Sequence, residues 1–209
     1  SFVKSCNTSF ANMGLSFDAE KFAKTCGGLL FNQPLPVEKM EASKSSFVLN
    51  KTSSTSEIME TSIGQGRTLV TPLHMLMITS AIANNGVLQT PYVIESTQNH
   101  DGGTVKTYAS TEYGSLMTEE EAGILKEYMK ETAVSGTASK LNGMSYQAYG
   151  KTGSAEFGNN KGDSHAWFIG FAHREDKEDI AIAVIFEKAG IGSAYAVPAA
   201  KAVFDAYYQ

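Results

Sequence analysis

The sequence has few of the residues that mark specialised classes of protein. It contains only two cysteines, Cys6 and Cys26, and neither stands at a CxxC or Cys–His spacing. A disulfide framework and a cysteine-based metal centre are therefore excluded. We expect both cysteines to be free thiols, although the sequence leaves open a single disulfide between them. His74, His100 and His173 share no ligand spacing either, so we expect no metal and no cofactor.

Long apolar runs and an excess of positive charge are also missing. A transmembrane helix needs about 20 consecutive apolar residues, whereas the run from Ile180 to Phe186 is much shorter. The first residues lack the charged-then-apolar pattern of a secretion signal. With 17 Lys and Arg against 22 Asp and Glu, the net charge is −5, and the basic residues are scattered. We therefore expect this chain to be soluble as given and not to bind nucleic acid.

The composition is that of an ordinary globular protein. With 42% hydrophobic and 19% charged residues, the 209 residues suffice for one domain with one core. Ser1 to Gly14 suits a short buried helix or a loop, and Ser16 can cap a helix from about Phe17 to Cys26. The serine-rich segment from Leu29 to Gly66 has no steady periodicity, and within it the stretch from Ser43 to Glu57 indicates a surface excursion.

Two helices have clear start signals. Thr71-Pro72 is a cap followed by a favoured first helical residue, and Asn85-Gly86 is a stop. The residues between them are apolar nearly all round, which indicates a core helix. The capping box Thr118-Glu119-Glu120-Glu121 opens another helix, to about Ala133. A turn-forming stretch between the two helices predicts a small β-ribbon, with strands in Pro91–Thr97 and Gly103–Tyr108.

The last third of the chain predicts an antiparallel meander of three strands followed by a helix, at Tyr146–Phe157, Ser164–His173, Asp179–Glu187 and Ala194–Tyr207. Residues on both faces of the last strand are apolar, so both faces need covering. The predicted fold class is therefore α/β (α+β), an antiparallel sheet flanked by helices on both faces. Three strands leave the edge beside the last strand bare, and we expect that the first strands of the sheet are missing from this chain.

A cation, two hydroxyls and a glycine stand together in the first of these strands, within Ala148–Phe157. Lys151 supplies a compact positive charge, Thr152 and Ser154 supply hydroxyls, and Gly153 lets another backbone approach closely. This combination predicts an anion-binding strand edge, for which a carboxylate is the natural ligand.

The surrounding motifs carry a family resemblance. Ser5-Cys6-Asn7 stands near the start, Gly136-Thr137-Ala138 precedes the Lys-Thr-Gly strand, and the aromatic run His165–Phe171 follows it. The stretch from Ser62 to Gly86 (SIGQGRTLVTPLHMLMITSAIANNG) is similar to class B members of one family. Over nearly its whole length the chain resembles the transpeptidase domain of penicillin-binding proteins, which shares its fold with serine β-lactamases. That family carries Ser-x-x-Lys, Ser-x-Asn and Lys-Thr-Gly around one cleft.

The first of the three motifs has no convincing match. Ser1-Phe2-Val3-Lys4 fits Ser-x-x-Lys literally, but it directly abuts Ser5-Cys6-Asn7, whereas a helical segment separates the two motifs in the family. The resemblance therefore implies that residues 1–209 are the C-terminal part of a single transpeptidase domain. The catalytic serine and its lysine base, together with the first two of five strands, would belong to a missing N-terminal part, which is then a required partner.

The resemblance also implies roles for the matching residues. Ser5 would relay a proton to the leaving amine, and Asn7 would hold the substrate amide. Lys151 and Thr152, beside Gly153, would bind the terminal carboxylate. The backbone N–H of Ser154 would form half of an oxyanion hole.

The implied function is that of a D,D-transpeptidase in bacterial cell-wall synthesis. A serine acyl-enzyme would form on a peptidoglycan stem peptide, and β-lactams would mimic that peptide. A β-lactamase or D,D-carboxypeptidase of the same fold is the alternative among enzymes. A non-catalytic module that binds peptidoglycan or β-lactams is the alternative of another class. The full-length protein is expected outside the cytoplasm, anchored in the cell membrane.

Overall fold

The computed structural model describes residues 1–158 and 163–209. Its helices are α1 (Asn7–Ser16), α2 (Ala19–Gly28), α3 (Thr55–Ser62), α4 (Pro72–Ala83), α5 (Glu119–Ser135), the short 3₁₀ helix η1 (Ser139–Leu141) and α6 (Gly192–Tyr207). Its strands are β1 (Val87–Gln89), β2 (Ser96–Gln98), β3 (Thr104–Thr107), β4 (Glu112–Ser115), β5 (Gln147–Glu156), β6 (Ser164–Arg174) and β7 (Lys177–Phe186). Within the described residues, no helix is both long and apolar enough to cross a membrane.

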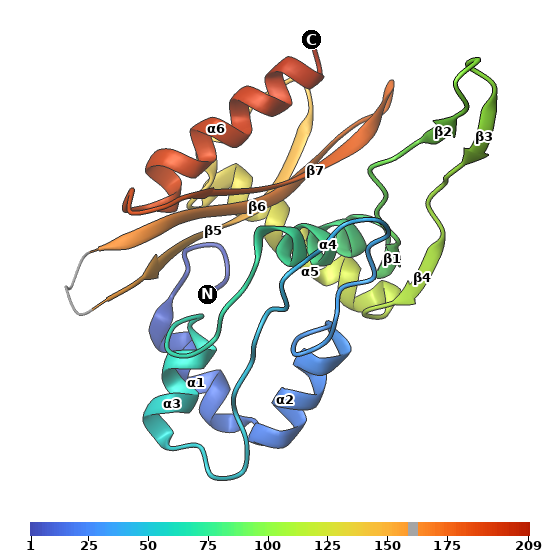
Figure 1. Ribbon diagram of the computed structural model, residues 1–209. Coiled ribbons are helices and arrows are strands. Elements are labelled where there is room, and N and C mark those ends of the chain that lie inside the picture. The colour runs from blue at the N-terminus through green and yellow to red at the C-terminus, as the bar shows by residue number, and fades with distance from the viewer. Residues whose placement is uncertain (159–162) are drawn as a thin grey trace.

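The main sheet is the predicted antiparallel meander, in the order β5-β6-β7. Helix α6 covers one face, while α4 and α5 cover the other (Figure 1). The alternation of side chains along β6 serves both layers: Phe168 packs with Val197 of α6, and Phe171 packs with Ile78 of α4 and Met129 of α5. The expected fold class, with helices on both faces of an antiparallel sheet, is confirmed.

Helix α4 begins and ends as predicted. The Thr71 hydroxyl accepts a hydrogen bond from the His74 N–H at 3.2 Å, and Pro72 is the first helical residue. The His74 side chain is fully buried and its Nε2 lies 2.7 Å from the carbonyl oxygen of Leu29, so the neutral ring ties α4 to the preceding loop. Burial lowers the pKa of His74. The capping box at Thr118 and Glu121 likewise starts α5.

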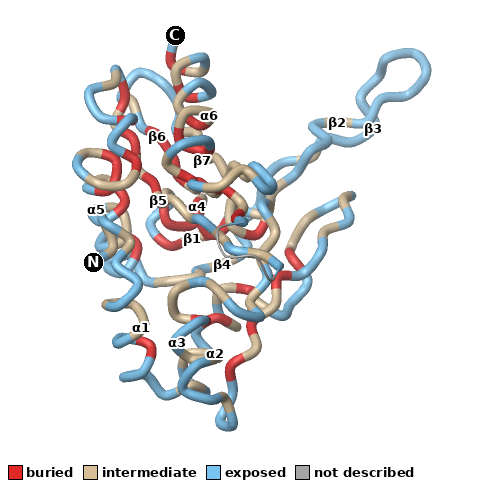
Figure 2. The backbone as a smooth tube through the Cα atoms, turned by 90° about the vertical axis from the view of Figure 1, so that its left-hand side faces the viewer, coloured by how far each residue is buried: buried red, intermediate tan, exposed pale blue. Residues whose placement is uncertain are grey.

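The predicted β-ribbon is also present. Strands β2 and β3 pair antiparallel around a turn in which Asn99 Oδ1 accepts from the Gly103 N–H at 2.7 Å. The ribbon projects from the body of the molecule and is almost entirely exposed (Figure 2).

Two expectations for the first third of the chain are wrong. The second helix does not start after Ser16, which ends α1; it starts at Ala19, where Asp18 is the cap and accepts from the Lys21 N–H at 2.9 Å. The stretch from Ser43 to Glu57 is not a surface excursion throughout. Its Phe47 and Leu49 are buried in a small core, and α3 begins near its end with a capping box at Ser54.

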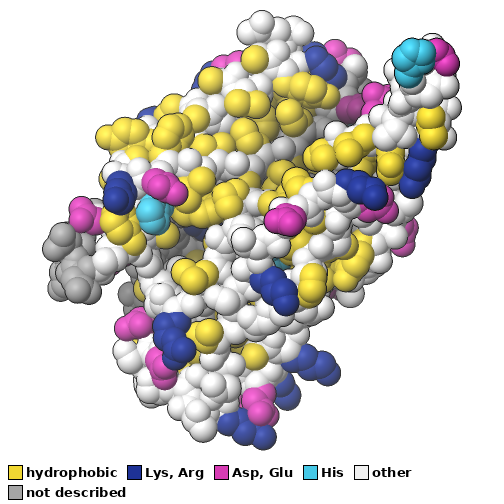
Figure 3. Space-filling model, in the orientation of Figure 1, with side chains coloured by type: hydrophobic (Ala, Val, Ile, Leu, Met, Phe, Trp, Pro, Cys, Tyr) yellow, Lys and Arg dark blue, Asp and Glu magenta, His cyan; other side chains and the backbone are white. Residues whose placement is uncertain are grey.

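The far edge of the sheet is β7. Its side chains from Ile180 to Ile185 are all only partly buried, although they are apolar on both faces of the strand. Hydrophobic side chains gather over the region of β7 and α6 on the face seen in Figure 3. Within the part of the chain that the structure describes, β5 and β7 are the two edges of the main sheet.

Close packing at the start of α6 yields a stability prediction. A Cβ at Gly192 would lie 2.4 Å from the carbonyl oxygens of both Gly153 and Trp167, so Gly192→Ala must push α6 away from the sheet. We expect it to lower the free energy of unfolding by about 1–3 kcal/mol, measured by urea denaturation. The control is Gly123→Ala in α5, where a Cβ meets nothing within 4 Å. That change should stabilise by about 0.4–1 kcal/mol, and equal effects of the two substitutions would contradict this packing.

Candidate active site

The candidate site forms where β5 meets the turn before α1. The Lys151 ammonium group donates a hydrogen bond to the Ser5 hydroxyl and another, of 2.7 Å, to the carbonyl oxygen of Thr152. Ser5 and Lys151 are 146 positions apart in the sequence. The structure thus brings the Ser-x-Asn and Lys-Thr-Gly motifs into direct contact.

A strained turn presents Ser5 to Lys151. Ser5 has φ +51°, a left-handed conformation that non-glycine residues rarely adopt. Its N–H donates to Phe2 O, and the Cys6 N–H donates to Ser1 O, each at 3.1 Å. Asn7, the first residue of α1, is exposed and lies two positions beyond Ser5. The structure therefore places Asn7 at the same corner of the molecule, with its amide group accessible.

The charge of Lys151 is held in an unfavourable environment. Burial lowers the pKa of its ammonium group to about 8, because desolvation penalises the charged form. The Phe2 ring, whose centroid is 5.7 Å from Nζ, adds apolar surroundings with a weak cation–π attraction. A partly desolvated cation of this kind binds an anion more strongly than a fully hydrated one, and a bound anion in turn favours the protonated form.

Thr137 belongs to the site although the sequence analysis assigned it no role. Its hydroxyl lies 2.6 Å from that of Thr152, and the two groups share a hydrogen bond. Its backbone N–H donates to Val3 O at 3.2 Å, and a Cβ on Gly136 would lie only 2.5 Å from the same Val3 oxygen. The segment after α5 therefore ties the Ser5 turn to β5 and orients the Thr152 hydroxyl.

The backbone of Ser154 faces the free edge of β5. Its carbonyl oxygen accepts a 3.1 Å hydrogen bond from Gln65 Nε2, on the side away from β6. The β5–β6 register runs without a bulge, and the N–H and C=O of one residue point to the same side in an antiparallel strand. The Ser154 N–H therefore also points outward. The Ser154 hydroxyl accepts from the Gly192 N–H at 3.3 Å, at the start of α6.

Gly153 stands where other groups approach closely, as expected. A Cβ there would lie 3.2 Å from that of Trp167, and the first residue of α6 sits against the Gly153 carbonyl. A side chain at Gly153 would press on Trp167 of the neighbouring strand β6, and one at Gly192 would push α6 away from the sheet, so both glycines keep the packing around β5 close.

Of the two cysteines, Cys6 lies in the Ser5 turn and is exposed, whereas Cys26 is buried away from the site. Cys6 and Cys26 are both free, and burial raises the pKa of Cys26 to about 11, which keeps its thiol protonated. Among the residues that the structure describes, no group of three or more His, Cys, Asp or Glu side chains could hold a metal ion.

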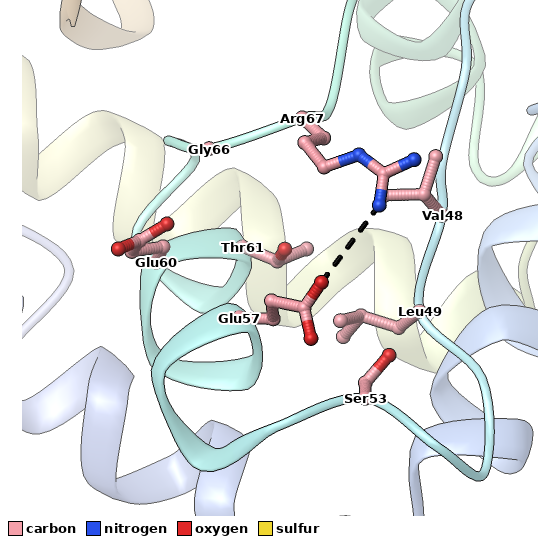
Figure 4. Close-up of a pocket in the computed structure, with 8 residues that line it drawn as sticks. All are labelled: Val48, Leu49, Ser53, Glu57, Glu60, Thr61, Gly66 and Arg67. Carbon is pink, nitrogen blue, oxygen red and sulfur yellow. Dashed lines mark ion pairs between the residues drawn. The ribbon is translucent and has the colours of Figure 1, made fainter.

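A small enclosed cavity lies beside α3 rather than at the candidate site. Its volume of about 30 Å³ has room for one or two water molecules. The Arg67–Glu57 ion pair, with 3.8 Å between the charged atoms, crosses it (Figure 4). The cavity is too small for a substrate, and the ion pair at its mouth is largely exposed.

Comparisons with known proteins identify the family of this chain. Residues 1–209 match the family model described as the penicillin binding protein transpeptidase domain. The chain is 30% identical over 212 residues to the peptidoglycan D,D-transpeptidase PbpA of Mycolicibacterium smegmatis, covering 98% of this chain and 42% of that protein. It is 34% identical over 185 residues to the peptidoglycan D,D-transpeptidase MrdA of Acinetobacter baumannii, covering 82% and 26%.

Solved structures show the same fold. Penicillin-binding protein A from M. tuberculosis, in its penicillin G acyl-enzyme complex, superposes with a TM-score of 0.87 at 28% identity, covering 100% of this chain and 47% of that one. This chain belongs to the penicillin-binding protein transpeptidase family. It spans less than half the length of the relatives PbpA and penicillin-binding protein A.

The lowered pKa of Lys151 is directly measurable. After reductive ¹³C-methylation of the folded chain, we expect the Lys151 signal, assigned by its loss in Lys151→Met, to titrate near pH 8. A carboxylate bound at the strand edge should raise that midpoint, because it favours the charged ammonium group; carboxylate binding should accordingly weaken above pH 8. A Lys151 titration near 10.5 would contradict the assigned burial.

Proposed function

We propose that this chain is the C-terminal part of the transpeptidase domain of a peptidoglycan D,D-transpeptidase. The observation that carries the proposal is the contact between Lys151 and Ser5, which joins the two family motifs at the free edge of β5. The homologous PbpA and MrdA proteins are peptidoglycan D,D-transpeptidases by name. The nucleophilic serine and its lysine base belong to a segment upstream of Ser1.

The donor peptide binds as an added strand along β5. Backbone groups of Thr152 and Ser154 face the free edge and pair with it, displacing the side chains that occupy their carbonyls. Its terminal carboxylate lies against Lys151 and the Thr152 hydroxyl, which Thr137 orients. The amide group of Asn7 both donates and accepts, as holding a peptide bond requires.

The reaction exchanges one acyl bond for another. The upstream serine attacks the carbonyl between two D-alanines, forming an ester and expelling the last D-alanine as an amine. The carbonyl oxygen becomes negatively charged in the transition state and is stabilised by the Ser154 N–H. An amine of a second peptide then attacks the ester, which forms the cross-link and releases the serine.

Ser5 completes the proton transfer to the leaving group. Because Lys151 donates to the Ser5 oxygen, the hydroxyl hydrogen is turned outward and can be given to the departing amine. The proton that the nucleophilic serine loses then replaces the proton that Ser5 has given to the amine. Lys151 in its charged form also favours the negative charge that develops at this hydroxyl.

The partners follow from the same chemistry. Peptidoglycan stem peptides are the substrates, and β-lactams bind as mimics of D-alanyl-D-alanine. The upstream part of the domain supplies further strands that pair along β7, whose apolar side chains are only partly buried. A substrate of this kind places the full-length protein on the outer side of the cell membrane, held there by segments outside this chain.

Intact mass after incubation with penicillin G tests the proposal. We compare the 209-residue chain with a version extended upstream through the next Ser-x-x-Lys motif. An adduct of the penicillin mass on the extended form alone is the expected result, because only that form contains the nucleophile.

Other results would assign the chain differently. An adduct on the 209-residue chain, mapped to Ser1 or Ser5, would place the nucleophile within these residues. Rapid loss of the adduct with hydrolysed penicillin would indicate a β-lactamase. Reversible binding by the extended form without any adduct would indicate a non-catalytic binding module.

A further inference from the structure

We propose that Gln65 acts as a specificity gate, which slows acyl donors that carry an amide N–H beside the reactive carbonyl. Its carboxamide N–H donates to the Ser154 carbonyl oxygen, and the amide N–H of such an acyl donor needs the same acceptor. The two residues are 89 positions apart, and Gln65 Nε2 donates to Ser154 O at 3.1 Å. This inference rests on the proposed transpeptidase function, and it adds a residue that discriminates between acyl donors.

The loop holds Gln65 in one conformation. Gly64 (φ +78°) and Gly66 (φ +75°) flank it, and both adopt backbone conformations that favour glycine. The Gln65 N–H donates to Glu60 O at 2.9 Å, which closes the turn directly onto the end of α3. Gln65 is partly exposed, and its carboxamide is held by the hydrogen bond to the Ser154 carbonyl oxygen.

Further contacts fix this loop relative to the site. Arg67 pairs with Glu57 beside the cavity of Figure 4, and Glu57 is itself held in the capping box of α3. A Cβ on Gly14 would overlap Ser62 Oγ at 1.8 Å, so α3 packs tightly on α1. The turn carrying Gln65 and the turn carrying Ser5 are therefore joined through one pair of helices.

Strand pairing explains why the gate acts on one donor group. When an extended ligand pairs with Ser154, one ligand residue accepts from the Ser154 N–H through its carbonyl and donates to the Ser154 carbonyl through its own N–H. The ligand carbonyl that accepts from the Ser154 N–H is the one that the nucleophile attacks. The ligand N–H that donates to the Ser154 carbonyl therefore belongs to the residue that carries the attacked carbonyl. Gln65 Nε2–H occupies this position in the structure and has to leave when such a ligand binds.

The cost of displacement depends on the ligand. Penicillin G carries an acylamino N–H on the carbon next to its reactive carbonyl, as the natural peptide does, and this N–H competes with Gln65. Imipenem carries a hydroxyethyl group at that carbon and no N–H, so it leaves the Gln65–Ser154 bond intact. The gate therefore slows donors with an amide N–H and leaves the others unaffected.

The test is the second-order rate of acylation of the full-length protein by penicillin G and by imipenem. We compare Gln65→Ala and Gln65→Met with wild type. Each variant should react about two- to tenfold faster with penicillin G, the value of one exchanged hydrogen bond, and at the wild-type rate with imipenem. The matched control is Gln33→Ala, which removes a glutamine side-chain bond of 2.6 Å to Gly27 O away from the site and should change neither rate.

Each of the following results would contradict the proposed role of Gln65. Equal slowing of both drugs by both variants, with an unchanged melting temperature, would make Gln65 a support for the strand. Slower acylation by penicillin G alone would make it a binding contact for the donor. Unchanged rates would show that the Ser154 carbonyl oxygen accepts hydrogen bonds from Gln65 and from the ligand N–H at the same time. If wild type forms no adduct with either drug, the proposed function fails, and the gate fails with it.

Discussion

The hydrogen bond from Lys151 to Ser5 is the interaction on which the site depends. It links an edge strand late in the chain to a strained turn at its start, and the segment after α5 contacts both through Thr137. The bond also sets the electrostatics, since the same burial that orients the ammonium group lowers its pKa to about 8. Position and reactivity of Lys151 therefore have one cause.

An edge strand that binds peptides also risks uncontrolled pairing. In this protein, β5 is covered at its free edge by side chains rather than by another strand: Lys151 donates to the Thr152 carbonyl and Gln65 donates to that of Ser154. These bonds satisfy outward-facing carbonyls, and under the proposed function a ligand strand has to displace them. The edge of β5 is therefore capped by side chains rather than closed by another strand within the described residues.

Sequence reasoning predicted the parts that depend on local signals. Thr71-Pro72 and the Thr118 capping box placed two helices, and alternation placed β5, β6 and β7. It missed α3, because a Ser- and Thr-rich segment has weak helix propensity and is stabilised here by its capping box. It also assigned no role to Thr137 or Gln65, since each acts through a long-range contact that no local pattern encodes.

The measurement that tests the central claim most directly is a double-mutant cycle on penicillin acylation of the full-length protein. It compares Ser5→Ala, Lys151→Met and the double variant, with melting temperatures as a check on folding. If the two residues act as one unit, each single change slows acylation at least about 100-fold, and the double variant is no slower than the slower single. Losses that multiply in the double variant would show that Lys151 and Ser5 act independently, which would contradict this account of the site.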